Sequence, residues 1–337
     1  MNGTPTTGGT TTAGCETREI LGIATGFESD SVEVSRVAAG AFAAWPLSDA
    51  EARVTVRIDV GAGSTKDSPR APIDYTLMGR SRVRISTPGS EVIADSASRH
   101  AHGRVTGQLL ADAEHFRYGV LEAATLFLLT HLDRVPFHAA AISGGEHAIL
   151  LAGHSGVGKS TLAYALMSHE PSSSLLADDA VYIETGARPR IWGWPGFLHL
   201  EPAAAGYFAE LRAREPEVVA NGKRKIALAT SPLTLATRSR KDDASWRESA
   251  VPRTALSVDR ASVVLLQRGG GRPRLEQLES GEAARALTES IEPGFDRFGD
   301  LLPAALRPFL EPHAWILDSG SDPHEAAALL LRSLGPT

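Results

Sequence analysis

The segment 153–160 has the composition and spacing of a loop that holds phosphate groups. It reads Gly-His-Ser-Gly-Val-Gly-Lys-Ser and matches the pattern G-x-x-x-x-G-K-S/T at every fixed position. Glycines let successive backbone N–H groups turn towards phosphate oxygens, which side chains at those positions would obstruct. We therefore expect Lys159 to reach the β- and γ-phosphates of ATP and the Ser160 hydroxyl to bind Mg²⁺. The predicted nucleotide-binding residues are Gly153, His154, Ser155, Gly156, Val157, Gly158, Lys159, Ser160 and Thr161.

Two adjacent carboxylates follow this segment. Asp178 and Asp179 come directly after a short apolar run, residues 175–177, and lie 19 residues beyond Lys159. One carboxylate can hold Mg²⁺, directly or through water, and the other can accept a proton from an attacking hydroxyl. Adjacent carboxylates repel, so one pKa should rise unless a metal or Lys159 compensates. The residues leave open which aspartate is the base, and the alternative for the pair is an exposed turn.

The segments around the loop predict a strand–helix–strand unit. Residues 148–152 form an unbroken apolar run, which is typical of a buried parallel strand. Residues from 159 to about 168 predict a helix, and 175–177 predict a short strand. Residues 262–266 predict a further core strand, and 323–334 an apolar helix that closes the chain. This order indicates an α/β fold, so the loop and the aspartates are both expected at strand ends.

The N-terminal part of the chain predicts a different class of structure. Apolar and polar residues alternate over 54–60 and 82–86, which is the period of half-buried strands, and the glycine-rich segment 61–66 is typical of a hairpin loop. Near residue 111 the apolar residues begin to recur at helical spacing. The predicted organisation is a disordered tail over 1–18, a small β-rich domain over 19–112 and a phosphate-binding α/β domain over 113–337.

The overall composition excludes several classes of protein. The 337 residues carry 34 lysines and arginines against 40 aspartates and glutamates, a net charge of −6, which does not favour the cationic surface that nucleic acid requires. The longest apolar stretches are far shorter than the roughly 20 residues of a membrane span, and the first residues lack the pattern of a signal peptide. The single cysteine, Cys15, suits a reducing compartment. We expect a cytoplasmic protein with neither nucleic acid nor membrane as partner.

Three segments together resemble the HPr kinase/phosphorylase-like serine kinases, whose P-loop fold is related to that of phosphoenolpyruvate carboxykinase. They are 137–141 (Phe-His-Ala-Ala-Ala), 153–161 (G-x-S-G-V-G-K-S-T) and 176–181 (Leu-Ala-Asp-Asp-Ala-Val). The resemblance covers about residues 120–200. It implies an α/β fold with a P-loop kinase domain, which the β-rich domain precedes. The regulatory members of the family form rings, so a homo-oligomer is one option, but the sequence leaves the oligomeric state open.

The resemblance assigns roles to individual residues. It implies that His138, Lys159, Asp178 and Asp179 face the γ-phosphate, that Ser160 and the two aspartates serve Mg²⁺, and that one aspartate deprotonates a protein serine. Taken alone, His138 beside a predicted strand would be an ordinary core or edge histidine. A histidine near a transferring phosphate can donate to an oxygen or orient an aspartate.

The chain also departs from the regulatory HPr kinases. Downstream of the aspartate pair, those enzymes carry a glutamate-arginine-glycine-leucine-glycine signature that is associated with dephosphorylation. Here residues 192–201 read Trp-Gly-Trp-Pro-Gly-Phe-Leu-His-Leu-Glu. This difference argues against phosphorylase activity and against HPr as the acceptor. The arrangement is more similar to a divergent branch found with peptide natural-product pathways, including lasso-peptide precursor kinases that phosphorylate a C-terminal serine.

The expected function is an ATP-dependent kinase that phosphorylates a serine of a peptide or small protein. Two alternatives remain open: a nucleotide-binding regulator or scaffold without transfer, and a small-molecule kinase on the same fold. Trp192 and Trp194 could wall an acceptor cleft or pack in a turn. Lys223 and Lys225 could clamp the γ-phosphate or belong to a solvated turn.

Overall fold

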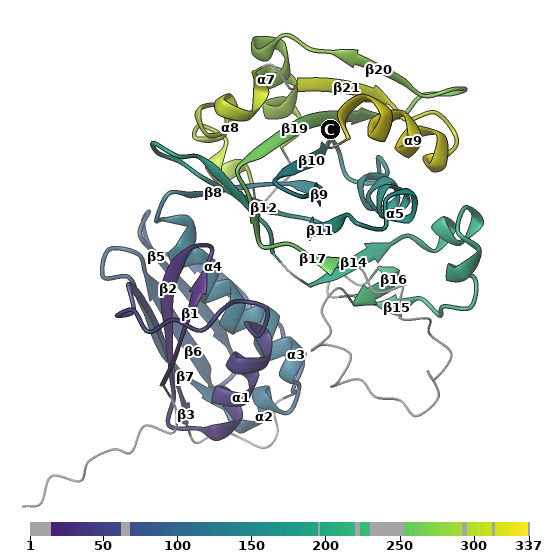
Figure 1. Ribbon diagram of the computed structural model, residues 1–337. Coiled ribbons are helices and arrows are strands. Elements are labelled where there is room, and N and C mark those ends of the chain that lie inside the picture. The colour runs from purple at the N-terminus through teal and green to yellow at the C-terminus, as the bar shows by residue number, and fades with distance from the viewer. Residues whose placement is uncertain are drawn as a thin grey trace, which may run out of the picture. The chain divides into compact units, whose positions relative to one another are not determined.

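The computed structural model describes residues 15–61, 68–194, 196–219, 223–229, 253–291, 295–311 and 314–335. The chain divides into two compact units, one ending at Leu132 and the other beginning at Asp133 (Figure 1). Over the described residues it is a mixed α/β protein with four β-sheets, and parallel and antiparallel pairs occur in the same sheet.

One sheet forms the framework of the N-terminal unit. Its strands are β1 (Cys15–Ile20), β2 (Ile23–Glu28), β3 (Val54–Gly61), β4 (Asp74–Leu77), β5 (Arg82–Thr87), β6 (Ser90–Asp95) and β7 (His100–Thr106). They lie in the order β1-β2-β3-β7-β6-β5-β4, and β3 pairs in parallel with both of its neighbours. Along β3 the apolar residues Val54, Val56 and Ile58 are buried, whereas Thr55 and Arg57 between them are partly exposed. The alternation predicted for this strand is confirmed, and it gives the sheet one apolar face.

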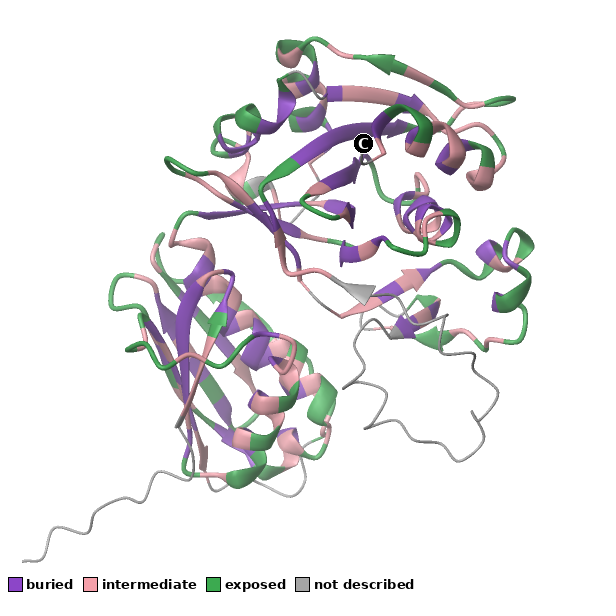
Figure 2. Ribbon diagram, viewed as in Figure 1, coloured by how far each residue is buried: buried purple, intermediate pink, exposed green. Residues whose placement is uncertain are grey.

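Helical segments cover that apolar face. They are α1 (Val32–Ala41), α2 (Gly107–Leu110), α3 (Ala113–Phe116), a π-helical turn (Arg117–Glu122) and α4 (Ala123–Thr130). α4 contacts β3, β5, β6 and β7, with Ala124 and Leu128 among its buried residues. Figure 2 shows the buried residues of this sheet and its helices in purple.

Two predicted boundaries are corrected by the structure. The pattern change near residue 111 predicts that the second domain starts at 113, but the units divide after Leu132, because the apolar side chains of α4 pack on the N-terminal sheet. The predicted tail over 1–18 is wrong at its end, since Cys15 begins β1 and Arg18 pairs with Thr25 of β2. Residues 1–14, and 62–66 of the predicted hairpin loop, lie outside the described residues.

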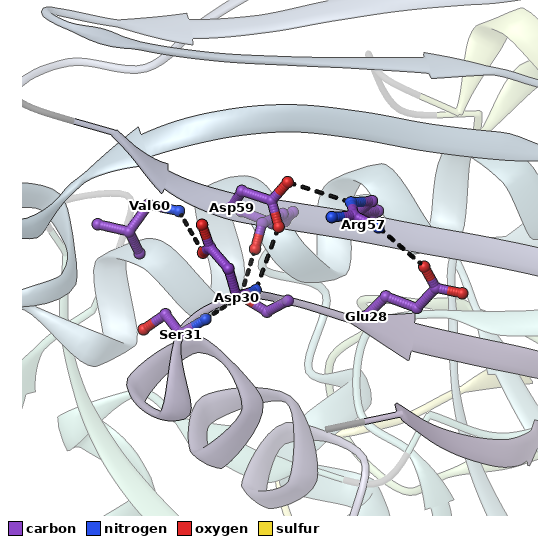
Figure 3. A network of polar contacts seen from close by, with 8 residues as sticks. Glu28, Asp30, Ser31, Arg57, Asp59 and Val60 are labelled. Atoms are coloured by element: carbon purple, nitrogen blue, oxygen red, sulfur yellow. Dashed lines mark hydrogen bonds and ion pairs between the residues drawn. The ribbon is translucent and has the colours of Figure 1, made fainter. Parts of the chain in front are cut away.

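A polar network fixes the start of α1 against β3 (Figure 3). Asp30 accepts a hydrogen bond from the backbone N–H of Val60 at 2.9 Å, and its own N–H donates to Asp59 at 3.2 Å. Arg57 donates to Asp59 at 3.1 Å and lies 3.6 Å from Glu28. These carboxylates are therefore used in joining β2, β3 and α1, which is a structural role.

The main sheet of the C-terminal unit places the residues of chemical interest. Its strands are β9 (Ala139–Gly144), β10 (His147–Ala152), β11 (Ser174–Ala177), β17 (Arg253–Thr254), β19 (Arg260–Gln267), β20 (Arg274–Gln277) and β21 (Ala314–Asp318). They lie in the order β17-β11-β9-β10-β19-β21-β20. β10, β19 and β21 are parallel, whereas β9 is antiparallel to both β10 and β11. The strands predicted over 148–152, 175–177 and 262–266 are confirmed as β10, β11 and β19.

Helices pack on both faces of this sheet (Figures 1 and 2). They are α5 (Lys159–His169) and α9 (Pro323–Leu334) on one face, and α7 (Ser280–Glu289) and α8 (Leu302–Leu310) on the other. β10 supplies alternate side chains to the two cores: Ile149 and Leu151 pack with α5 and α9, and Ala148 and Leu150 pack with α7 and α8. Burial on both faces explains why the strand is apolar from Ala148 to Ala152. The predicted helices at 159–168 and 323–334 are confirmed as α5 and α9.

Two smaller sheets complete the unit. One has the order β18-β13-β12-β8, from β8 (Arg134–Phe137), β12 (Val181–Glu184), β13 (Arg190–Trp192) and β18 (Ser257–Val258). The other has the order β14-β16-β15, from β14 (Phe197–Leu200), β15 (Glu217–Val218) and β16 (Arg224–Ala229). Short 3₁₀ turns lie at Pro202–Gly206, Ala209–Leu211 and Asp296–Phe298. Across the described ranges, no helix is long and apolar enough to span a bilayer.

Candidate active site at the carboxyl edge of the main sheet

Strand direction brings three predicted site segments to one edge of the main sheet. β10 and β11 are both antiparallel to β9, so both of them end where β9 begins. Ala139 at the start of β9 pairs with Ala152 at the end of β10, which places His138 beside Gly153. Asp178 follows β11 at the same edge. The antiparallel strand between β10 and β11 is thus what assembles the site.

The glycine loop, residues 153–158, joins β10 to α5. Gly153, Gly156 and Gly158 have φ angles of +137°, +75° and +111°, a region that residues with a Cβ rarely adopt. Gly153 is further restricted, because a Cβ there would lie 2.9 Å from the carbonyl oxygen of Leu266 on β19. His154 and Ser155 are exposed. The glycines therefore permit a tight loop pressed against the neighbouring strand.

We expect Gly153→Ala to destabilise the protein more than Gly156→Ala does. Both variants place a Cβ at positive φ, a strain of about 1–3 kcal/mol, but only at position 153 does the new Cβ also meet backbone, since Gly156 has open space around it. The free energy of unfolding in urea measures the difference. Equal losses would show that the contact with β19 does not constrain the loop.

Lys159 is the first residue of α5 and is only 7% exposed. Its ammonium donates hydrogen bonds to the carbonyl oxygens of Gly153 at 2.7 Å and His154 at 3.2 Å. Ser160 and Thr161 follow in the first turn of the helix and are partly exposed. A buried cation is thus held against the loop, next to the end of a helix that favours negative charge.

Asp178 is held in place by a hydrogen bond from the backbone of β14. It is 7% exposed, and its Oδ2 accepts a hydrogen bond from the backbone N–H of His199 on β14 at 2.7 Å. The ring Nδ1 of His199 lies 3.7 Å from the same oxygen. Oδ1 is buried and has no hydrogen-bond partner among the described residues. A carboxylate with one oxygen fixed and the other unused suits a further ligand, because a buried oxygen without a partner is unfavourable.

Asp179 differs from its neighbour in exposure and in proton affinity. Its side chain reaches solvent, yet protein atoms crowd the carboxylate, and this loss of solvation raises its pKa, as does the negative charge of Asp178. His138, His199 and Lys159 act in the opposite direction and lower the pKa of Asp179. These four side chains therefore lie within electrostatic range of Asp179. The pair therefore contains one fixed carboxylate and one accessible carboxylate with increased basicity.

The raised pKa of Asp179 predicts a pH-dependent stability. The folded protein binds this proton more tightly than the unfolded chain, so stability falls as pH rises from the ordinary carboxyl range through the raised pKa. We expect Asp179→Asn to be more stable than the wild type at pH 7, by less than about 1 kcal/mol because the group is exposed, and equally stable below about pH 3.5. Urea unfolding across pH measures this, with Asp300→Asn, at another exposed aspartate, as the control. A constant difference at all pH values would contradict it.

Residues around this centre include two that sequence reasoning missed. His199 contacts Asp178, and Arg268, just after β19, donates to the carbonyl oxygen of Gly156 in the glycine loop at 2.6 Å. The sequence does contain a signal for His199. It lies between the apolar residues Leu198 and Leu200, which are buried, so in a strand its side chain points to the opposite face. For Arg268 the only signal is its place two residues after the core strand predicted over 262–266.

The remaining sequence candidates occupy other positions. Trp192 is 8% exposed and donates its indole N–H to Glu184 at 2.8 Å, which favours packing over a cleft wall. The ring of Trp194 lies 5.9 Å from that of Tyr182. Lys225 pairs with Glu201 at 2.6 Å, and Lys223 is exposed just before β16, after a gap in the described residues. The carboxylate of Glu201 therefore neutralises the charge of Lys225.

His138 lies between β8 and β9, partly buried, with its ring centroid 5.3 Å from that of Phe295. Within the described part of the chain, no three His, Cys, Asp or Glu side chains cluster as a metal centre. Any divalent cation at this edge would thus need a hydroxyl, water or ligand oxygen besides the aspartates. Comparison with protein-family models and with curated proteins finds no match for this chain.

Proposed function

We propose that this protein is an ATP-dependent kinase that transfers the γ-phosphoryl group to a serine hydroxyl of a peptide or small protein. The observation that carries the proposal is that the glycine loop with Lys159 and the pair Asp178 and Asp179 lie at the same edge of the sheet. A loop of this kind provides backbone donors and a cation for phosphates. An accessible carboxylate beside it provides a base, which nucleotide binding alone does not require.

The two aspartates are suited to different tasks. Asp179 is accessible and has a raised pKa, so it is the better general base. It accepts the proton of the serine hydroxyl while the serine oxygen forms a bond to the γ-phosphorus. The bond between that phosphorus and the β–γ bridging oxygen breaks, and ADP leaves with the electron pair. Lys159 and the loop N–H groups stabilise the negative charge on the phosphate oxygens throughout.

The residues present fit Mg²⁺ as the accompanying metal. The unused buried Oδ1 of Asp178 and the Ser160 hydroxyl are hard oxygen donors, and Mg²⁺ binds proteins through one or two carboxylates together with substrate phosphates. When bound, Mg²⁺ neutralises charge on the phosphate groups. The backbone N–H of His199 keeps Asp178 in place for this contact.

The finer classification is part of the same proposal. The resemblance over residues 137–181 favours a kinase domain of the HPr kinase/phosphoenolpyruvate carboxykinase type, and the residues at 192–201 favour the branch that acts on natural-product precursor peptides. We further propose a cytoplasmic location and a homo-oligomer, both of which rest on the sequence alone. The N-terminal unit would recruit or regulate the acceptor.

Incubation with ATP, Mg²⁺ and peptides encoded by neighbouring reading frames tests the proposal. The expected result is a gain of about 80 Da on an intact peptide, the mass of one phosphoryl group, with ADP released in equal amount. Tight ATP binding without phosphate on any acceptor would instead indicate a nucleotide-dependent regulator or scaffold. Transfer to a small metabolite and not to a peptide would indicate a small-molecule kinase.

A further inference from the structure

Arg268 occupies a defined place beside the glycine loop. β19, which it follows, is the parallel neighbour of β10, with Leu265 opposite Ala152. The guanidinium donates to the carbonyl oxygen of Gly156 at 2.6 Å, so it lies across the loop. Arg268 is exposed, and no other contact of its side chain is found among the described residues. A guanidinium has five N–H donors, so most of its donors remain available to a ligand.

The order of strands gives a direction to any phosphate chain in the loop. β11, which bears the aspartates, lies on one side of β10, and β19 lies on the other. If the terminal phosphate faces Asp178 and Asp179, as the proposed function requires, the nucleoside end must extend over the end of β19. Arg268 stands at that end.

The next strand limits how far the phosphates can extend. Asp318 ends β21, and its carboxylate lies against Gly269, where a Cβ would be 1.8 Å from Oδ1. This carboxylate accepts a hydrogen bond from the N–H of Gly320 at 3.1 Å. A carboxylate repels phosphate groups but accepts hydrogen bonds from hydroxyl groups. The nucleoside end of the phosphate chain should therefore lie between the glycine loop and Asp318. Arg268, which contacts Gly156 and precedes Gly269, is a cation within that interval.

We infer that Arg268 binds the nucleoside-proximal phosphates of the bound nucleotide, with Lys159 acting at the terminal phosphate from the other end of the loop. The inference rests on the proposed function. An arginine suits this position because its planar fork binds phosphate oxygens with more than one N–H. ADP and ATP share the α- and β-phosphates, so the contact made by Arg268 should be the same for both.

Calorimetric titration of the full chain with ATP and with ADP, in Mg²⁺, tests this inference. We expect Arg268→Gln to weaken both nucleotides by the same factor, about ten-fold or more, as is typical for loss of a charged hydrogen bond. The dependence of Kd on KCl should also become shallower, because a screened charge has been removed. Arg260→Gln is the matched control, since Arg260 is an exposed arginine at the opposite end of the same strand.

Each possible outcome distinguishes the inferred role of Arg268 from an alternative. Unchanged affinity in Arg268→Gln overturns the inference, and a loss confined to ATP places the side chain at the γ-phosphate instead. A loss for both nucleotides with an unchanged salt dependence would mean that Arg268 only shapes the loop through the Gly156 carbonyl. If the wild-type protein binds neither nucleotide, the proposed function fails, and that result is separate from any effect of the variant.

Discussion

Lys159→Met is expected to remove phosphoryl transfer, with a loss of about 100- to 1,000-fold or more. The ammonium is a buried cation that lies against the glycine loop, where the proposed function places the terminal phosphate. Loss of a preorganised charge-stabilising donor has an effect of this size. Methionine keeps the length and the helix propensity of the side chain, so α5 should still form. The measurement is labelled phosphate on the acceptor peptide, with unfolding in urea as the test of folding.

The matched control is again Arg260→Gln, which removes an exposed positive charge at the opposite edge of the sheet. It should leave transfer unchanged. Transfer by Lys159→Met at the wild-type rate would overturn the assignment of the glycine loop as the phosphate site.

Much of the C-terminal unit could be predicted because its signals are local. The apolar run at 148–152 follows from burial on both faces, and the glycines of 153–158 follow from backbone angles that only they adopt readily. The same local reading placed the aspartates at a strand end. These features depend on residues close in sequence, where periodicity and residue type are informative.

The features that could not be predicted depend on pairings between segments that are distant in the sequence. No local pattern predicts that β9 lies antiparallel between β10 and β11. That arrangement is what brings His138, the loop and the aspartates to one edge of the sheet. His199 reaches Asp178 through a separate small sheet, 21 residues further along the chain. The apolar spacing after residue 111 predicts a helix, but the unit to which that helix belongs depends on which sheet its apolar residues cover.

Changing each aspartate to asparagine should have a different effect on catalysis and on ATP binding. Asp179→Asn removes the accessible base, and we expect a loss of kcat of about 100- to 10,000-fold with little change in ATP affinity, since the base acts on the acceptor. Asp178→Asn should lose transfer by at least about 100-fold and also show weaker binding of ATP in the presence of Mg²⁺, because the fixed carboxylate is the better metal ligand.

The distinction rests on geometry, since the two side chains are adjacent in sequence and carry the same charge. One oxygen of Asp178 accepts a hydrogen bond from the N–H of His199, and the other is buried. Asp178 is therefore poorly placed to accept a proton from the acceptor hydroxyl. Asp179 is exposed and its pKa is raised by desolvation and by Asp178, which brings it closer to the proton affinity that a base needs. Single-turnover transfer rates and nucleotide titrations on both variants make the comparison. If Asp178→Asn loses only kcat while Asp179→Asn loses Mg²⁺-dependent affinity, the roles are reversed.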